Sequence, residues 1–171
     1  MEEVPIAAHV FPRNHGMVVG VLTGIGIGFL NAYLGVELGS WTSIVFLLLA
    51  SIATVLILHE GIHGGVAWVL GHKPHFGIEP PLVFTTFKKR LPKNHFILVA
   101  IAPLILLDAV FIAMYVQDIF PAFSNLCFAV NTIGAIGDVW IAATLIRYPA
   151  EVFVQDTKSG VEIWTTASDS G

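Results

Sequence analysis

Charged residues are scarce in this sequence. Asp, Glu, Lys and Arg make up only 12% of its 171 residues, whereas 56% are hydrophobic, and the mean hydropathy is +0.81. Soluble domains carry roughly twice this share of charge. The shortage excludes an ordinary soluble domain and predicts one integral membrane domain over residues 1–171, with the lipid bilayer as its surroundings.

Cysteine is almost absent as well. The single Cys127 excludes an internal disulfide and lies in an apolar run typical of a core position. The N-terminus reads Met1-Glu2-Glu3-Val4-Pro5, so it lacks the basic segment and short apolar core of a secretory signal. We therefore expect the first hydrophobic helix to remain in the protein.

Four long apolar stretches predict transmembrane helices, at about 17–38, 41–70, 94–116 and 122–147. The expected fold is an all-α membrane protein with four transmembrane helices. The second stretch would be about 45 Å long, which exceeds a hydrocarbon core of about 30 Å. It must therefore tilt in the bilayer or project from it.

Two segments read as extended rather than helical. Between the second and third helices, in residues 71–93, three prolines (Pro74, Pro80 and Pro81) precede the β-forming run Leu82–Phe87, which predicts a short extended segment or hairpin. Near the C-terminus, residues 151–155 and 161–165 alternate around a turn-like stretch. They predict a small hairpin outside the membrane, with a loose tail as the alternative. We expect residues 1–15 to form a tail or an interfacial segment.

The basic residues predict the orientation. All eight Lys and Arg residues fall at Arg13, within residues 73–93, or at Arg147 and Lys158, and the connections near residues 37–40 and 117–121 contain none. The positive-inside rule then places both termini and the middle connection on the cytoplasmic side of the cell membrane, in a multi-pass protein.

Small residues form a ridge on the first helix. Gly16, Gly20, Gly24 and Gly28 recur every four residues, a spacing that lets another helix backbone approach closely. The ridge favours packing against the protein's own helices. A homodimer interface is the alternative.

One stretch carries chemistry. His59-Glu60-Gly61-Ile62-His63 matches H-E-x-x-H, in which two His ligands for zinc lie one turn apart on a helix face and the Glu handles protons. Residues 41–58 and 64–71 around it hold no charge. Ionisable groups inside a membrane helix are costly, so this cluster predicts a functional site. A haem or quinone site would use the two histidines but leaves Glu60 without a role.

Catalytic zinc needs a third protein ligand, and depth in the membrane distinguishes the two candidates. His63 lies ten residues, or about 15 Å, from the basic residue after its helix, and Asp138 lies nine residues, or about 13–14 Å, from its own. Asp108 is fifteen residues, or about 22 Å, from the basic residue before its helix. Depth therefore favours Asp138, and Asp108 is expected to form hydrogen bonds between helices.

Asn131 precedes Asp138 by seven residues and so lies on the same helix face, about 10 Å away. It is a candidate for binding the substrate backbone or an oxyanion. An interhelical hydrogen bond is an equal alternative.

His59-Glu60-x-x-His63 on the second helix, followed after one helix by Asn131 and Asp138, resembles the core of site-2 proteases, which are intramembrane zinc metalloproteases. This chain departs from their Asn-x-x-Pro-x4-Asp-Gly pattern, with Gly134 in place of the Pro, one residue fewer, and Val139 after the Asp. No extra regulatory domain is expected within these residues.

The whole layout is more similar to a compact family of zincin peptidases with four membrane helices. That likeness includes Ala102-Pro103-Leu104, Gly137-Asp138-Val139-Trp140 and the tail over residues 152–164, and it covers roughly residues 16–165.

The resemblance implies that His59, His63 and Asp138 bind Zn²⁺ and that Glu60 is the catalytic base. The expected function is a zinc metalloendopeptidase that hydrolyses peptide bonds of membrane-protein or membrane-proximal substrates. The alternative is a catalytically inactive membrane protein that binds metal or haem or has a regulatory role. No nucleic-acid partner is expected.

Overall fold

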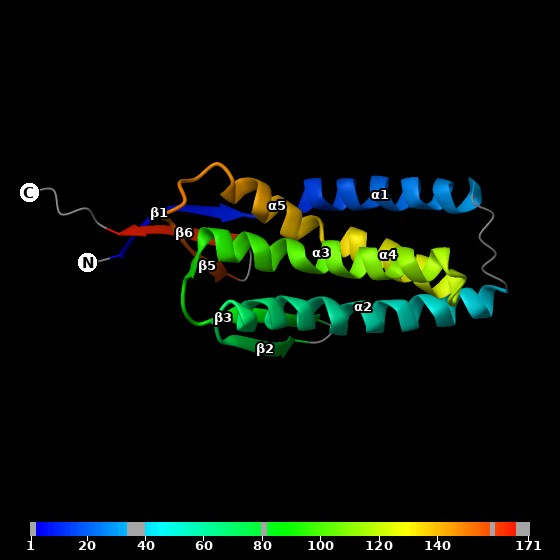
Figure 1. Ribbon diagram of the computed structural model, residues 1–171. Helices are drawn as coiled ribbons and strands as arrows, with labels where there is room; N and C mark the ends of the chain where they lie inside the picture. The colour runs from blue at the N-terminus through cyan, green and yellow to red at the C-terminus, as the bar shows by residue number, and fades with distance from the viewer. Residues whose placement is uncertain (1–2, 34–39, 80–81, 158–159, 167–171) are drawn as a thin grey trace, which may run out of the picture.

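The computed structural model describes residues 3–33, 40–79, 82–157 and 160–166. The helices lie side by side, with a sheet at one end of them (Figure 1). The helices are α1 (Arg13–Tyr33), α2 (Trp41–Val69), α3 (Lys93–Val116), α4 (Pro121–Gly134) and α5 (Ile136–Leu145). The strands are β1 (Glu3–Val10), β2 (Pro74–Glu79), β3 (Leu82–Phe87), β4 (Leu91–Pro92), β5 (Phe153–Thr157) and β6 (Gly160–Thr166).

Two helices among the described residues, α2 and α3, are each long and apolar enough to cross a membrane. Their mean hydropathies are 2.3 and 2.7 over the spans Thr42–Val69 and Lys93–Val116. Only 11% and 33% of these windows is buried inside the protein. So much exposed apolar surface is not stable in water, which indicates association with a membrane. Both helices lie within one residue of their predicted bounds.

The last predicted helix is divided into two. α4 and α5 bend by 41° at a break around Ala135, and they provide a third span only if the pair is counted as one. On α1 the apolar stretch found among the fully described residues, Gly16–Gly28, is shorter than a full span. The predicted end of that first helix, at residues 34–38, lies outside the described residues.

The expectation of an all-α protein with four transmembrane helices is therefore wrong. The structure has two sheets as well as five helices in its described parts, and the larger sheet has the strand order β1-β6-β5-β4. The segment expected to be a tail forms β1, which pairs antiparallel with β6 from Glu3↔Thr166 to Val10↔Gly160. β1 is an edge strand with an irregular register between Pro5 and Ala7, the kind of position where a sheet tolerates proline.

The extended segment predicted between the second and third helices is an antiparallel hairpin. β2 pairs with β3 from Pro74↔Phe87 to Glu79↔Leu82, and the hairpin lies along the C-terminal half of α2 (Figure 1). The Phe76 ring occupies the space where Gly64 would carry a side chain. The absent Cβ at this position of α2 therefore allows the hairpin to approach the helix closely. Pro80 and Pro81 lie outside the described residues.

The core has two parts. One joins the ends of α2, α3 and α5 to the larger sheet and includes Phe96, Leu145 and Ile163. The other lies among α2, α3 and α4 and includes Leu107 and Cys127, which is fully buried, as predicted.

The glycine ridge of α1 meets neighbouring helices of the same chain. Added Cβ atoms at Gly20 and Gly24 would contact Ile133, and the one at Gly20 would also contact Ile136. This is the packing within the chain that the sequence favoured.

Candidate metal centre

Three predicted ligands meet between α2 and α5. His59 and His63 lie one turn apart on α2, with ring centroids 4.7 Å apart and ring planes at 78°. The carboxylate of Asp138 from α5 lies 3.1 Å from Nε2 of His59 and 3.7 Å from Nε2 of His63. One ligand atom from each of the three residues lies within 4.8 Å of the others.

A chain of hydrogen bonds fixes the ring of His59. Its Nδ1–H donates to Oδ1 of Asn131 on α4 at 2.9 Å, and Nδ2 of Asn131 donates to Oδ1 of Asp108 on α3 at 2.8 Å and to the carbonyl of Pro103 at 3.2 Å. Thr132 donates to the other oxygen of Asp108 at 2.9 Å. The two acceptors of Nδ2 define which way the Asn131 amide points, so the amide oxygen faces His59.

The ring of His63 is fixed by a backbone carbonyl instead. Its Nδ1–H donates to the carbonyl oxygen of Val99 at 2.8 Å. In an α-helix this carbonyl would accept from the N–H four residues later, but that residue is Pro103, which has no N–H. The proline inside α3 therefore leaves an acceptor free at the level of the site.

The break between α4 and α5 places the third ligand. Asp138 falls in the first turn of α5, where unpaired backbone N–H groups stabilise a negative charge. An unbroken helix over residues 121–145 would offer no such helix end beside the two histidines.

These residues fit a metal ion. With both Nδ1 atoms donating protons, the Nε2 atoms of His59 and His63 are the basic nitrogens, and both face the Asp138 carboxylate. Two imidazoles and a carboxylate converging in this way need a shared cation, either protons or a metal. Two His and one carboxylate form a common donor set of catalytic zinc sites, and hydrogen bonds on the outer ring nitrogens typically orient such ligands.

Glu60 follows His59 on α2 and is partly buried. Its backbone carbonyl accepts a hydrogen bond from the hydroxyl of Thr85 on β3 at 2.9 Å. The hairpin is thus attached to α2 at the residue predicted to be the base.

A small cavity of about 70 Å³ lies beside the cluster, lined in part by His63, Asp138, Thr85 and Asp156. The pKa of Asp156 is raised to about 6, mainly by burial and to a lesser degree by the charge of Glu60, against a hydrogen bond from Thr86 that lowers it. The sequence did not predict a role for Asp156, because this residue falls in the turn-like stretch between the two alternating segments. The alternation of residues 151–155 could have extended the strand to include it.

The structure thus brings together the three predicted ligands, with Glu60 next to His59. Asn131 forms the interhelical hydrogen bonds that were the equal alternative, and its side chain is fully buried. A contact between Asn131 and a substrate stays a prediction. Asp108 bonds between helices, as the depth argument predicted, rather than joining the cluster.

Comparison with known proteins gives one curated relative and one family. A protein of Pyrococcus woesei, described as "Uncharacterized 24.7 kDa protein in gap 5'region", is 25% identical over 137 residues. The alignment covers 77% of this chain but only 61% of that relative, so the chain spans less than two thirds of the relative's length. No solved structure matches the chain.

The family match covers the site. The family described as "Putative zincin peptidase" matches residues 52–153, a range that includes His59, Glu60, His63 and Asp138. This range is more than half of the chain, and the chain belongs to that family.

Proposed function

We propose that this protein is a zinc metalloendopeptidase that hydrolyses peptide bonds of membrane proteins or of peptides close to the membrane. The observation that carries the proposal is the convergence of His59, His63 and Asp138, with each imidazole held through its outer nitrogen. A site built only for packing has no need to direct three ligand atoms at one point.

His59 and His63 would hold the metal through Nε2, and Asp138 through its carboxylate. Zinc supplies Lewis-acid chemistry, because it lowers the pKa of water toward neutrality and polarises a carbonyl group. Asn131 and the Val99 carbonyl keep the two imidazoles in the orientation that this task requires.

Glu60 would move the protons. Its carboxylate accepts a proton from the attacking water, whose oxygen bonds to the scissile carbonyl carbon. The same proton then passes to the amide nitrogen as the C–N bond breaks, so the leaving amine departs neutral and Glu60 is regenerated. The hydrogen bond from Thr85 to the Glu60 carbonyl restrains this residue relative to the hairpin.

The position of the site supports a membrane substrate. His59, Glu60 and His63 all lie on α2, within a segment long enough and apolar enough to span a bilayer. We place both termini and residues 71–93 on the cytoplasmic side, on the basis of the basic residues there. Water and the substrate would then reach the metal centre from the cytoplasmic side.

The rival reading, a haem-binding protein, is disfavoured by the geometry. The two imidazole rings are in edge contact, with centroids 4.7 Å apart, so a macrocycle does not fit between them. A metal-binding protein without turnover differs from the proposal only in the role of Glu60.

Glu60→Gln tests that role. The variant should keep about one zinc per chain, yet lower the cleavage of co-expressed membrane proteins by about 10²- to 10⁴-fold, because it cannot accept a proton. New peptide ends would be counted by quantitative mass spectrometry, and metal by elemental analysis. Glu151→Gln, at an exposed site outside the cluster, is the matched control. Equal cleavage by wild type and Glu60→Gln would refute the peptidase mechanism.

A further inference from the structure

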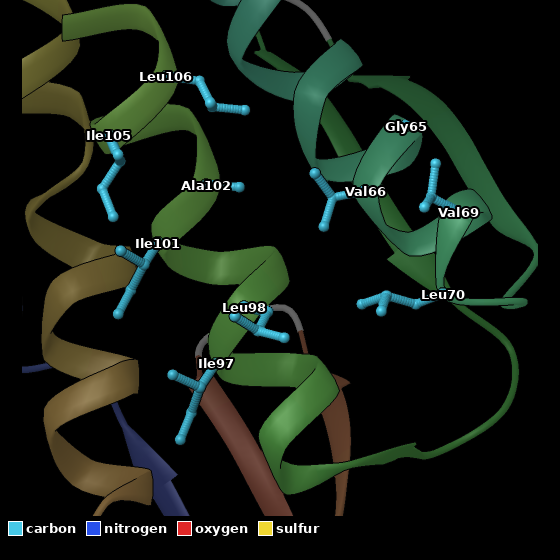
Figure 2. Close-up of a pocket in the computed structure, with 10 residues that line it drawn as sticks. All are labelled: Gly65, Val66, Val69, Leu70, Ile97, Leu98, Ile101, Ala102, Ile105 and Leu106. Carbon is cyan, nitrogen blue, oxygen red and sulfur yellow. The ribbon is translucent and has the colours of Figure 1, made fainter. Parts of the chain in front are cut away.

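An apolar groove runs along the outside of the protein between α2 and α3. It has a volume of about 520 Å³, and no polar residue lines it (Figure 2). Gly65 and Ala102, which contribute little or no side chain, leave the surface hollow where the two helices face each other. Both helices are candidate membrane spans, so the groove opens toward lipid.

The groove has the length of one membrane leaflet. It extends along α3 from Ile97 to Leu106, ten residues whose ends are about 14 Å apart along the helix. That is roughly half of a hydrocarbon core of about 30 Å. A transmembrane helix of another protein would need a groove along the whole span, whereas a single acyl chain needs only this half.

A basic pocket begins where the groove ends. Leu70, the residue directly after α2, lines the groove, and the next two residues, Gly71 and His72, line a second pocket of about 300 Å³. Its other polar lining residues are Lys73, His75, Lys88 and Lys89. No acidic residue of the described ranges lines it. Both volumes fall in the usual range of small-molecule sites.

The three lysines of this pocket have no counter-charge among the described residues. None of Lys73, Lys88 and Lys89 forms an ion pair within the described part of the chain, and all three are exposed. Two nearby cations do have partners, because Arg90 forms an ion pair with Glu3 and Lys93 donates a hydrogen bond to the carbonyl of Tyr148. The pocket therefore keeps positive charge available for an anion at the end of two membrane helices.

We propose that the groove and pocket together bind one anionic phospholipid. The headgroup phosphate lies among Lys73, Lys88 and Lys89, and one acyl chain lies in the groove past Ala102. Basic pockets at the ends of membrane helices bind anionic headgroups in this way, and lysine binds phosphate as a point charge. The ring of His59 contacts Asn131 and Asp138, and Nε2 of His63 faces Asp138. The proposed lipid site is therefore separate from the metal centre.

The test is lipid binding by the purified full chain, measured by native mass spectrometry. Phosphatidylglycerol and phosphatidylcholine with identical acyl chains are titrated separately, and inorganic phosphate is titrated as a third probe. We expect wild type to bind phosphatidylglycerol at least tenfold more tightly than phosphatidylcholine. Lys73→Gln, Lys88→Gln and Lys89→Gln combined should remove that preference. Arg147→Gln, at an exposed cation outside the pocket, should keep it.

Ala102→Phe tests the groove. Filling it should weaken phosphatidylglycerol binding about tenfold, whereas Ala109→Phe, at an exposed α3 position outside the groove, should not. Each variant must elute as a single species, which keeps folding defects out of the comparison. Equal affinity of wild type for the two lipids would overturn the proposal. So would phosphate binding as tight as that of the lipid, or full affinity in Ala102→Phe.

Discussion

Nδ1 of His63 donates to the carbonyl of Val99 at 2.8 Å, a bond that exists because Pro103 cannot donate to the same oxygen. A residue usually regarded as a helix breaker thus orients a candidate ligand on another helix. The Pro103 carbonyl itself accepts from Asn131, which in turn bonds His59. Both imidazoles therefore depend on the turn of α3 that contains this proline.

Replacing Pro103 with Ala tests this dependence. The new N–H would compete for the Val99 carbonyl, so His63 would lose part of its orientation and zinc affinity should fall about tenfold or more. The thermal midpoint should not fall, because proline inside a helix is itself unfavourable. Zinc competition titration and a melting curve give the two readouts, with Pro149→Ala as the control. Unchanged zinc affinity would show that His63 does not need this bond.

Removing the ligands should remove the metal. We expect about one zinc per chain in wild type and almost none in His59→Ala, His63→Ala or Asp138→Ala by elemental analysis. Asp108→Ala should lose much less, because Asp108 contacts Asn131 and Thr132 rather than the cluster. His75→Ala serves as a histidine control. Full zinc in either histidine variant at the cluster would refute the metal site.

Asn131→Ala separates two roles of one amide. If Asn131 acts by orienting His59, zinc affinity should fall by about 10- to 100-fold. If it instead binds an oxyanion, zinc affinity should stay normal and the turnover rate should fall by about 10²- to 10³-fold. The buried position and the bond to His59 favour the first outcome. The zinc affinity and the turnover rate would both be measured on the same protein preparation.

The carboxyl of Asp156 should make stability depend on pH. Its pKa is about 6 in the folded protein and near 4 in an unfolded chain. The folded state therefore binds more protons in this window, so stability falls as pH rises from about 4 to about 6 and stays lower above it. The full loss is about 3 kcal/mol at most, for a shift of about two pH units.

Asp156→Asn should remove this dependence and raise the melting temperature by a few degrees at pH 7. Melting curves from pH 4 to 8 would show it, and Asp118→Asn, on an exposed connection, is the comparison. The same slope in Asp156→Asn and wild type would assign the pH dependence to another group.

The orientation of the chain in the membrane can be measured with fused topology reporters. A reporter fused after Gly171 or inserted near Lys89 should give a cytoplasmic signal, and one near Asp118 an external signal, because basic residues concentrate in the first two regions. An external signal near Lys89 would reverse the orientation proposed above.

The sequence predicted those features that depend on local pattern. α2 was predictable because residues 41–58 lack charge, and the choice of Asp138 over Asp108 needed only the rise per residue and the nearest basic residues. Pro74 and the β-forming residues before Lys88 likewise predicted the β2–β3 hairpin. In each case the signal lay within one segment.

The features that the sequence did not predict depend on contacts between distant segments of the chain. β1 contains Pro5 and has little apolar alternation, so its pairing with β6 has no local signal. The break at Ala135 has no proline to mark it. Asp156 belongs to the site because β5 lies beside the hairpin, and no pattern around residue 156 contains that information.

The pairing in the larger sheet also constrains how often the chain crosses a membrane. β1, β4 and β6 share one sheet, and hydrogen-bonded strands of one sheet cannot lie on opposite sides of a bilayer. The number of crossings between β1 and β4, and between β4 and β6, is therefore even. A crossing by α2 or by α3 therefore requires the chain to return before the next strand of this sheet. The strand pairing within one sheet thus limits the chain to an even number of membrane crossings between its strands.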